Sequence, residues 1–147
     1  MPAIRESLVA LDTNEYLFAL RRDVAYPFCE SLVFDYIHAL NLYVPAEIQL
    51  ELRRNLTDYE VRDILEVLRR PQAVVFDYTP ADDEAVSRWQ ARGAKKGDAV
   101  ISALLERSRV AYFVSENRHF LREISGLPFQ VVSSEEAIRL LDSSPGP

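Results

Sequence analysis

Short apolar runs alternate along this chain with longer segments of helical periodicity. The runs are rich in β-branched and aromatic residues, which is typical of buried strands; they are SLVAL (7–11), LYV (42–44), AVVFDY (73–78), VAYFVS (110–115) and FQVV (129–132). The segments between them repeat apolar residues at three- and four-residue steps, as amphipathic helices do; they are 26–40, 45–56, 59–70, 79–92, 98–109, 116–124 and 133–141. Alternating strands and helices predict an α/β fold, a three-layer α/β/α sandwich with a mainly parallel sheet.

Capping residues support several of these helices. Thr57 precedes the segment 59–70 as a preferred N-cap residue, and Gly93 ends the segment 79–92. Ser133 and Glu136 have the spacing of a capping box at the last helix. The boundaries predicted from periodicity therefore agree with independent local signals.

Length and composition predict one globular domain. The chain has 147 residues, of which 48% are hydrophobic and 27% charged, as in ordinary single domains. We expect a single domain over 1–142 and a disordered tail over 143–147. No apolar run approaches the roughly 20 residues of a membrane span, the start MPAIRESL lacks the pattern of a signal peptide, and the single Cys29 allows no intramolecular disulfide. These features predict a cytoplasmic protein without a membrane partner.

Charge and missing motifs narrow the function classes. The formal net charge is −6 and the pI is about 5.0, which argues against binding nucleic acid by bulk positive charge. Neither GxxxxGK[ST] nor GxGxxG occurs, so a glycine-rich nucleotide cradle is not predicted. His38 and His119 lack the HxxxH spacing of zinc hydrolases. An acidic metal site remains compatible with this composition.

Polar residues follow the predicted strands at four places. Asp12 ends the first strand, Glu51 lies on the helix after the second, Asp98 opens a helix after AKKG, and Asn117 follows the fourth strand. Functional sites in α/β sheets form at the carboxyl ends of the strands. Gathered carboxylates repel one another unless a cation neutralises them, and oxygen ligands suit Mg²⁺ or Mn²⁺.

Each of these residues also has an ordinary structural interpretation. Asp12 and Asp98 are both good N-cap residues, and either taken singly is more simply a cap. Glu51 fits a solvated helix face, and Asn117 is a common turn residue. The metal-site hypothesis depends on the four lying together.

Four motifs, in order along nearly the whole chain, point to one family. VALDTNEYLFAL has a hydrophobic-DTN pattern with its acid at Asp12, and VPAEIQLELRRNL places a glutamate at Glu51 rather than Glu47. KKGDAVISALLERS places a second aspartate at Asp98, and AYFVSENRHFL is a strand followed by a polar turn. Together these segments resemble the PIN-domain family, a nuclease fold whose bacterial and archaeal members include VapC-type toxins.

The fourth segment departs from the family pattern, which is usually a strand followed by T-x-D-x-D-F. Ser115 stands for the threonine, Asn117 for the first aspartate, His119 for the second and Phe120 for the phenylalanine. The neighbouring acid, Glu116, is one place out of register. Asparagine offers a carbonyl oxygen but no charge, so we expect a weakened second metal position.

The resemblance implies a ribonuclease that hydrolyses RNA phosphodiester bonds with Mg²⁺ or Mn²⁺. Asp12 and Asp98 would bind the main metal ion, Glu51 would complete the acidic cluster, and Asn117 would orient a water or weakly bind a second ion. Water rather than a side chain would be the nucleophile. Asn14 is expected to donate a hydrogen bond that holds one of the acids in place. Ser115 either does the same or caps the following helix.

The resemblance also implies partners. PIN toxins are held by small antitoxin proteins that insert into the acidic cleft, and members commonly pair as homodimers. The aromatic-rich segment 26–40 would bury its rings against a second copy or against its own core. Lys95, Lys96 and Arg118 are candidate phosphate contacts, although each is also an ordinary surface residue.

Two alternatives remain open. One is a catalytically weakened PIN module that acts in RNA or protein binding, which Asn117 favours and the retained acids oppose. The other is a phosphatase with an aspartyl nucleophile at Asp12, but that chemistry uses a second acid two residues on, where this chain has Asn14.

Overall fold

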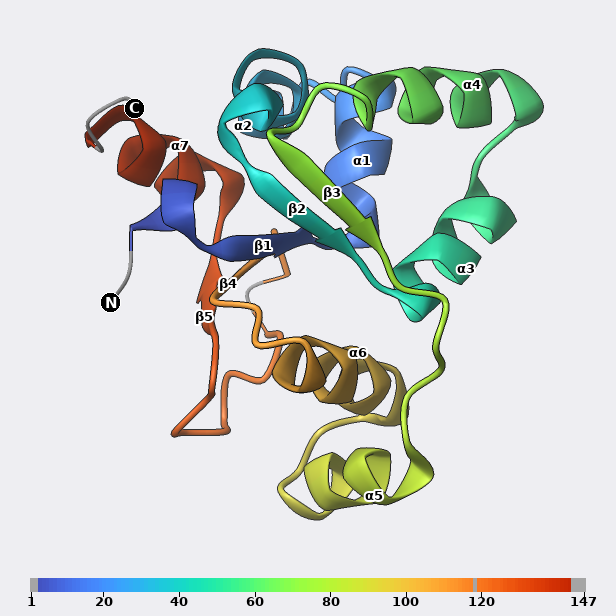
Figure 1. The fold of residues 1–147 in the computed structure, drawn as a ribbon, viewed down its shortest axis with the longest axis vertical. Helices are drawn as coiled ribbons and strands as arrows, with labels where there is room; N and C mark the ends of the chain where they lie inside the picture. Colours follow the sequence, from blue (N-terminus) through green and yellow to red (C-terminus); the bar gives the residue numbers. More distant parts are fainter. Residues whose placement is uncertain (1–2, 118, 144–147) are drawn as a thin grey trace.

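A five-stranded parallel sheet forms the centre of the protein (Figure 1). The computed structural model describes residues 3–117 and 119–143. The strands are β1 (Leu8–Leu11), β2 (Asn41–Val44), β3 (Ala73–Phe76), β4 (Tyr112–Val114) and β5 (Gln130–Val132). They lie in the order β3-β2-β1-β4-β5, and all four pairings are parallel. Each strand coincides with one of the five predicted runs, so the predicted α/β fold is confirmed.

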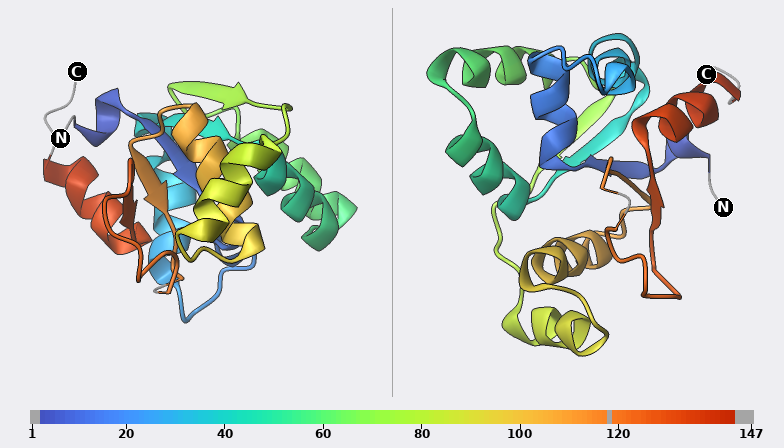
Figure 2. Two further views of the ribbon diagram at one scale, coloured as in Figure 1. Left: turned by 90° about the horizontal axis from the view of Figure 1, so that it is seen from below. Right: turned by 180° about the vertical axis from the view of Figure 1, so that it is seen from behind.

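Helices cover both faces of the sheet (Figures 1 and 2). The helices are α1 (Thr13–Leu20), α2 (Pro27–Ser31), α3 (Ala46–Asn55), α4 (Asp58–Val67), α5 (Asp83–Ala91), α6 (Lys96–Arg107) and α7 (Ser134–Ser143). The short turns η1 (Ile4–Glu6), η2 (Leu32–Tyr36) and η3 (Ile37–Ala39) complete the helical elements of the described residues. α5 and α6 pack together on one side of the sheet, and α1, α2 and α7 lie on the other. This is the predicted three-layer arrangement.

The three inner strands lie at the centre of a core to which the surrounding helices also contribute. β4 is buried throughout, and Val9, Ala10 and Leu11 of β1 are almost completely inaccessible. β1 pairs with β4 in register, with Ala10 opposite Phe113. β1 has a neighbouring strand on each side and helices on both faces of the sheet. The residue that follows β1 therefore has a fixed position.

The edge strand β3 differs from its prediction. The run 73–78 was expected to be buried, yet Val75 is 48% exposed and Phe76 39% exposed. β3 pairs with β2 on one side only, so its outer edge and much of its side-chain surface face solvent. The strand itself was predicted correctly, but its burial was not.

The predicted helix 26–40 is present but changes its winding twice. It begins as the α-helix α2, continues as the π-helical turn η2 and ends as the 3-10 turn η3. Cys29 is buried in the core, whereas Tyr26 and Phe28 stay exposed. Tyr26 stacks on Phe18, with 4.1 Å between ring centroids. The segment therefore buries one face in its own core.

The short helix predicted at 116–124 is wrong over the residues that the structure describes. Turns replace it. Asn117 Oδ1 accepts a hydrogen bond from the His119 backbone N–H at 3.0 Å, which closes an Asx turn instead of a helical turn. Leu121 adopts a φ of +52°, which no right-handed helix allows.

The N-cap expected at Thr57 and the capping box expected at Ser133 are both formed. Thr57 Oγ1 accepts from the Glu60 backbone N–H at the start of α4. Ser133 Oγ accepts from the Glu136 N–H, and the Glu136 carboxylate accepts from the Ser133 N–H, before α7.

Two further expectations concern the ends of the chain and the membrane. Residues 144–147 of the predicted tail lie outside the described residues, and Ser143 ends α7. None of the helices in the described ranges is long and apolar enough to cross a bilayer.

Candidate metal centre

Asp12 stands at the carboxyl end of β1, where it caps α1. Its Oδ1 accepts from the Thr13 backbone N–H at 2.8 Å, as an N-cap carboxylate does. Its Oδ2 accepts from Ser115 Oγ, also at 2.8 Å. The Asp12 backbone N–H donates to Val114 O at 2.8 Å, continuing the β1–β4 pairing. The cap interpretation is therefore correct, but a residue 103 positions away also fixes the carboxylate.

Ser115 links Asp12 to the turn that carries Asn117. Its hydroxyl donates to Asp12 and accepts from the Asn117 backbone N–H at 3.1 Å. Within the described residues no helix follows Ser115 for it to cap. The hydroxyl instead holds the Asp12 carboxylate and the Asn117 turn in a fixed relation.

Glu51 reaches the same region from α3. The hydroxyl of Thr13, the residue after Asp12, donates to Glu51 Oε2. Thr13 is buried and Glu51 is half-buried, so this contact is shielded from solvent. The Thr13 contact places Glu51 beside the start of α1.

Asp98 lies in the first turn of α6, whose N-cap is Lys95. Asp98 is therefore not the N-cap residue of α6, and its simpler structural interpretation is wrong. It lines a cavity of about 630 Å³ together with Lys95, Asn117 and His119. Asp98 and Asn117, from different elements, thus face one solvent-accessible space.

Asp12 lies in the electrostatic field of Glu51 and Asp98, and we call these three acids the open cluster. Burial raises the pKa of Asp12, and the charges of Glu51 and Asp98 raise it further, against the hydrogen bonds from Ser115 and Thr13. Burial also raises the pKa of Asp98, and the charge of Lys95 partly offsets this effect. Bringing these acids together has an electrostatic cost that a cation would offset.

The donor set of the open cluster suits a hard divalent cation. It offers carboxylate oxygens, the ligands that Mg²⁺ and Mn²⁺ prefer. These carboxylates are not tightly gathered: among the described residues, the one group of three His, Cys, Asp or Glu side chains with all ligand atoms within 4.8 Å lies elsewhere. Such spacing is compatible with Mg²⁺, which keeps several of its waters and uses only one or two protein carboxylates.

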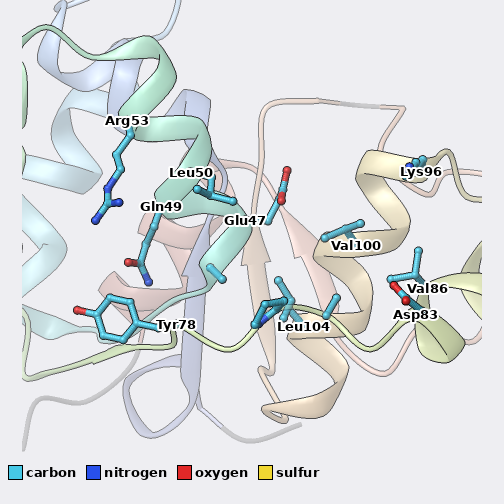
Figure 3. Close-up of a pocket in the computed structure, with 13 residues that line it drawn as sticks. Glu47, Gln49, Leu50, Arg53, Tyr78, Asp83, Val86, Lys96, Val100 and Leu104 are labelled. Carbon is cyan, nitrogen blue, oxygen red and sulfur yellow. The ribbon is translucent and has the colours of Figure 1, made fainter.

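A separate apolar groove lies beside the open cluster, between α3, α5 and α6 (Figure 3). Its volume is about 400 Å³, and Leu50 and Glu47 of α3 face Val100 of α6 across it. Glu47 thus lines this groove, whereas Glu51, one turn further on, contacts Thr13. The two glutamates of α3 therefore have different surroundings.

The other predicted residues are the supporting residue Asn14 and the candidate phosphate contacts Lys95, Lys96 and Arg118. Asn14 is exposed, and its side chain makes no hydrogen bond to an acid within 3–117 and 119–143, so its supporting role stays a prediction. Lys95 and Lys96 are exposed; Lys95 lines the cavity of Asp98 and Lys96 lines the apolar groove. Arg118 lies outside the described residues.

Sequence reasoning missed a second group, Glu15, Cys29 and Glu116, which we call the buried cluster. Their ligand atoms all lie within 4.8 Å of one another. Burial, followed by the adjacent Glu116, raises the pKa of Glu15 to about 10. Helical spacing could have identified Glu15, since it lies four residues before the buried Ala19 on the same face of α1.

Comparison with known proteins identifies the fold. By sequence, the chain matches no protein-family model and no curated protein. By structure, it is similar to FitAcB from Neisseria gonorrhoeae, with a TM-score of 0.59 and 13% identity over 86% of this chain and 98% of that one. VapBC2 from Rickettsia felis, solved bound to a DNA fragment from their promoter, gives a TM-score of 0.56 at 13% identity, covering 86% and 98% of the two chains.

A third similar structure is PAE2754 from Pyrobaculum aerophilum, with a TM-score of 0.54 and 18% identity over 96% of this chain and 93% of that one. At such low identities the likeness shows the fold alone. The protein has a PIN-domain-like fold, as the four sequence motifs predict.

Proposed function

We propose that this protein is a divalent-metal-dependent ribonuclease of the PIN type. The observation that carries the proposal is the position of Asp12, which two hydrogen bonds hold at the carboxyl edge of the sheet in the field of Glu51 and Asp98. Asp12 and Asp98 would hold the main Mg²⁺ or Mn²⁺ ion, and Glu51 would complete the anionic site. When bound, the ion supplies Lewis-acid chemistry toward a phosphodiester.

The chain's own residues have the complementary tasks of positioning and substrate binding. Ser115 and the Thr13 backbone fix the Asp12 carboxylate, and the Thr13 hydroxyl fixes Glu51. The cavity beside Asp98 is open enough for a nucleotide, and Lys95 on its rim offers a positive charge to a phosphate. Water is the nucleophile in this proposal, because the two hydroxyls that contact the open cluster, those of Ser115 and Thr13, already donate to Asp12 and Glu51.

We also propose that the protein is the toxin of a toxin–antitoxin pair. The support is the structural likeness to FitAcB and VapBC2, and the apolar groove of Figure 3, in which a peptide could bury side chains against Leu50, Val100 and Leu104. Pairing with a second copy and a cytoplasmic location remain predictions from the sequence.

The test is cleavage of single-stranded RNA with Mg²⁺ or Mn²⁺. We expect the wild type to cleave, EDTA to stop it, and Asp98→Asn to reduce the rate at least about a hundredfold, since removing a metal ligand removes several kcal/mol of transition-state stabilisation. Asp63→Asn on the exposed face of α4 is the matched control and should retain the wild-type rate. A rate that EDTA leaves unchanged, or equal rates for wild type and Asp98→Asn, would overturn the proposal.

Asn117 favours the alternative of a catalytically weakened module that binds RNA or protein. Its side chain lies in the cavity of Asp98 but brings no charge, and its Oδ1 is already hydrogen-bonded to the His119 N–H. Asn117→Asp keeps this acceptor and adds a negative charge. In the same assay a gain in rate at limiting Mn²⁺ supports a weakened second metal position; an unchanged rate means that Asn117 is sufficient.

A further inference from the structure

The buried cluster joins three elements that lie on one face of the sheet. Glu15 comes from α1, Cys29 from α2 and Glu116 from the residues after β4. Glu15 and Cys29 are completely inaccessible to solvent, and Glu116 is half-buried. Two carboxylates and a thiol within 4.8 Å of one another, with no lysine or arginine among them, need an explanation.

Glu15 is the member of the buried cluster that hydrogen bonding leaves unsatisfied. Neither of its carboxylate oxygens has a hydrogen-bond partner within the described residues, and both are inaccessible. One of these oxygens lies within 4.8 Å of the Cys29 sulfur and of a Glu116 carboxylate oxygen. A buried carboxylate of this kind destabilises the fold unless a ligand satisfies it.

Glu116, by contrast, is held firmly at the start of α7. Its carboxylate accepts from the Ser134 backbone N–H at 2.9 Å and from the Ser134 hydroxyl at 3.1 Å. The positive end of the helix dipole favours a carboxylate at that place. The Ser134 hydroxyl also lies 3.8 Å from the Cys29 sulfur, so it borders the same space.

We propose that the buried cluster is a second metal site, which takes Zn²⁺. Glu15, Cys29 and Glu116 supply two carboxylates and one thiolate, and a water or the Ser134 hydroxyl completes a four-coordinate shell. The sulfur ligand selects a borderline transition cation over Mg²⁺ or Ca²⁺. On binding, the thiol proton of Cys29 and any proton on Glu15 pass to solvent, which leaves the thiolate and both carboxylates as ligands.

Glu116 is the member of the buried cluster that borders a solvent-accessible cavity. This residue lines a cavity of about 740 Å³ formed with residues of α2 and the start of α7, among them Phe28 and Ser133. A hydrated ion can meet the half-buried carboxylate of Glu116 first and then exchange its waters for Cys29 and Glu15.

The site has a structural consequence. A bound Zn²⁺ would tie α1, α2 and the segment after β4 to one centre, immediately behind the turn that carries Ser115 and Asn117. The proposal does not depend on the nuclease proposal, because the buried cluster and the open cluster share no residue.

Cobalt(II) gives a direct test on the full chain. Metal-free protein is titrated with Co²⁺ in excess Mg²⁺, so that Mg²⁺ competes for the open cluster. Cys29 is the only cysteine in the sequence, so a sulfur-to-cobalt charge-transfer band reports this residue alone. We expect the band to saturate at one equivalent and to disappear when Zn²⁺ displaces the cobalt.

Variants separate the two clusters. Cys29→Ser should lose the band, and Glu15→Gln should weaken Co²⁺ binding about tenfold or more. Asp98→Asn, in the open cluster, should bind Co²⁺ with the same band as the wild type. Zn²⁺ should also raise the unfolding temperature of the wild type but not that of Glu15→Gln, which keeps the shape of the side chain.

Three results would contradict the zinc-site proposal. A wild type without the charge-transfer band, or an identical band in Cys29→Ser, overturns the proposal. So does a Glu15→Gln variant with wild-type Co²⁺ affinity and the wild-type zinc shift in unfolding temperature. The Glu15→Gln comparison remains decisive if Cys29→Ser does not fold.

Discussion

The open cluster and the buried cluster contain the same kind of acid under different conditions. Asp12 in the open cluster is half-buried, accepts two hydrogen bonds and lies at the edge of the sheet. Glu15, three residues later, is completely buried and has no hydrogen-bond partner among the described residues. Burial raises the pKa of both carboxylates, but only Asp12 has hydrogen bonds from a hydroxyl and a backbone N–H, those of Ser115 and Thr13, that oppose this effect.

The difference teaches what an acid needs before it can bind a metal ion. The open cluster is pre-arranged by Ser115 and Thr13, so a hard cation meets anionic oxygens that are already oriented. In the buried cluster, burial raises the pKa of Glu15 and of the Cys29 thiol, so these two groups must lose protons first. The open cluster is therefore suited to a hydrated, exchanging ion, and the buried cluster to a tightly held one.

The largest expected contrast is in catalysis. Asp12→Asn should reduce the rate of RNA cleavage about a thousandfold, because the amide removes the charge that the ion needs. Glu15→Gln should change the rate far less, since Glu15 is not among the acids that would hold the catalytic ion. The measurement is the single-turnover rate at saturating Mn²⁺. Equal losses in the two variants would mean that the clusters act as one site.

The next contrast is in stability against pH, measured in EDTA. The pKa of Glu15 rises from 4.5 to about 10 on folding because of burial and the neighbouring Glu116, with smaller effects of Cys29 and Asp12. Such a group stabilises the fold fully below pH 4.5 and loses that contribution as the pH rises through about 10. Glu15→Gln stays neutral throughout, so its stability relative to the wild type should increase with pH above 4.5.

The expected gain of Glu15→Gln is about 3 kcal/mol at pH 7 and larger at pH 9. Urea unfolding of both proteins at several pH values measures it. A pH-independent difference between the two would show that Glu15 is ionised in the folded protein.

A smaller effect is expected at the contact between Thr13 and Glu51. Thr13→Val keeps the shape of the side chain but removes the donor to Glu51, so the cleavage rate should fall about tenfold. Thr13→Ser should restore the rate, because it keeps the hydroxyl. The metal concentration for half-maximal rate should rise in Thr13→Val, and a purely structural role would leave that concentration unchanged.

The smallest effect concerns Asp77, an acid outside both clusters that has a cationic partner. Its Oδ2 accepts from the Tyr43 hydroxyl at 2.5 Å and from Arg107 at 2.8 Å. Partial burial raises the pKa of Asp77, but these bonds and one from the Thr79 N–H outweigh it and lower the pKa to about 2.

This lowered pKa stabilises the fold above pH 3.8, and the contribution is lost as the pH falls through about 2. Asp77→Asn should therefore destabilise the protein by about 1 kcal/mol at pH 7, because Arg107 is partly exposed. The loss should vanish near pH 2. An Asp77→Asn variant as stable as the wild type at pH 7 would show that the ion pair contributes nothing.

Most of the fold could be predicted because its signals are long and redundant. Each strand is a compact apolar run, and α4 and α7 carry capping boxes that agree with their periodicity. The edge position of β3 could not be predicted, since Val75 and Phe76 look like core residues wherever a strand lies in its sheet. The Asx turn at Asn117 competes with helix formation through a side-chain contact that periodicity does not report.

The candidate site was predictable only in part. Asp12 and Asp98 stand out because they follow strand and helix signals in order, and the motif register separates Glu51 from Glu47. Helical spacing could place Glu15 on the buried face of α1, but it could not show that Cys29 and Glu116 lie beside it. Only the packing of α1 against α2 reveals its surroundings.

The bond between Ser115 and Asp12 has a consequence for the timing of biosynthesis. It joins residues 103 positions apart, and β1 finds its central place only when β4 pairs with it. When the first hundred residues of a nascent chain have emerged from the ribosome, they include Asp12, Glu51 and Asp98. They do not yet include β4 and the Ser115 hydroxyl, which orient Asp12. Such long-range pairing forms late in folding. The proposed ribonuclease activity would thus appear only when synthesis of the chain is almost complete.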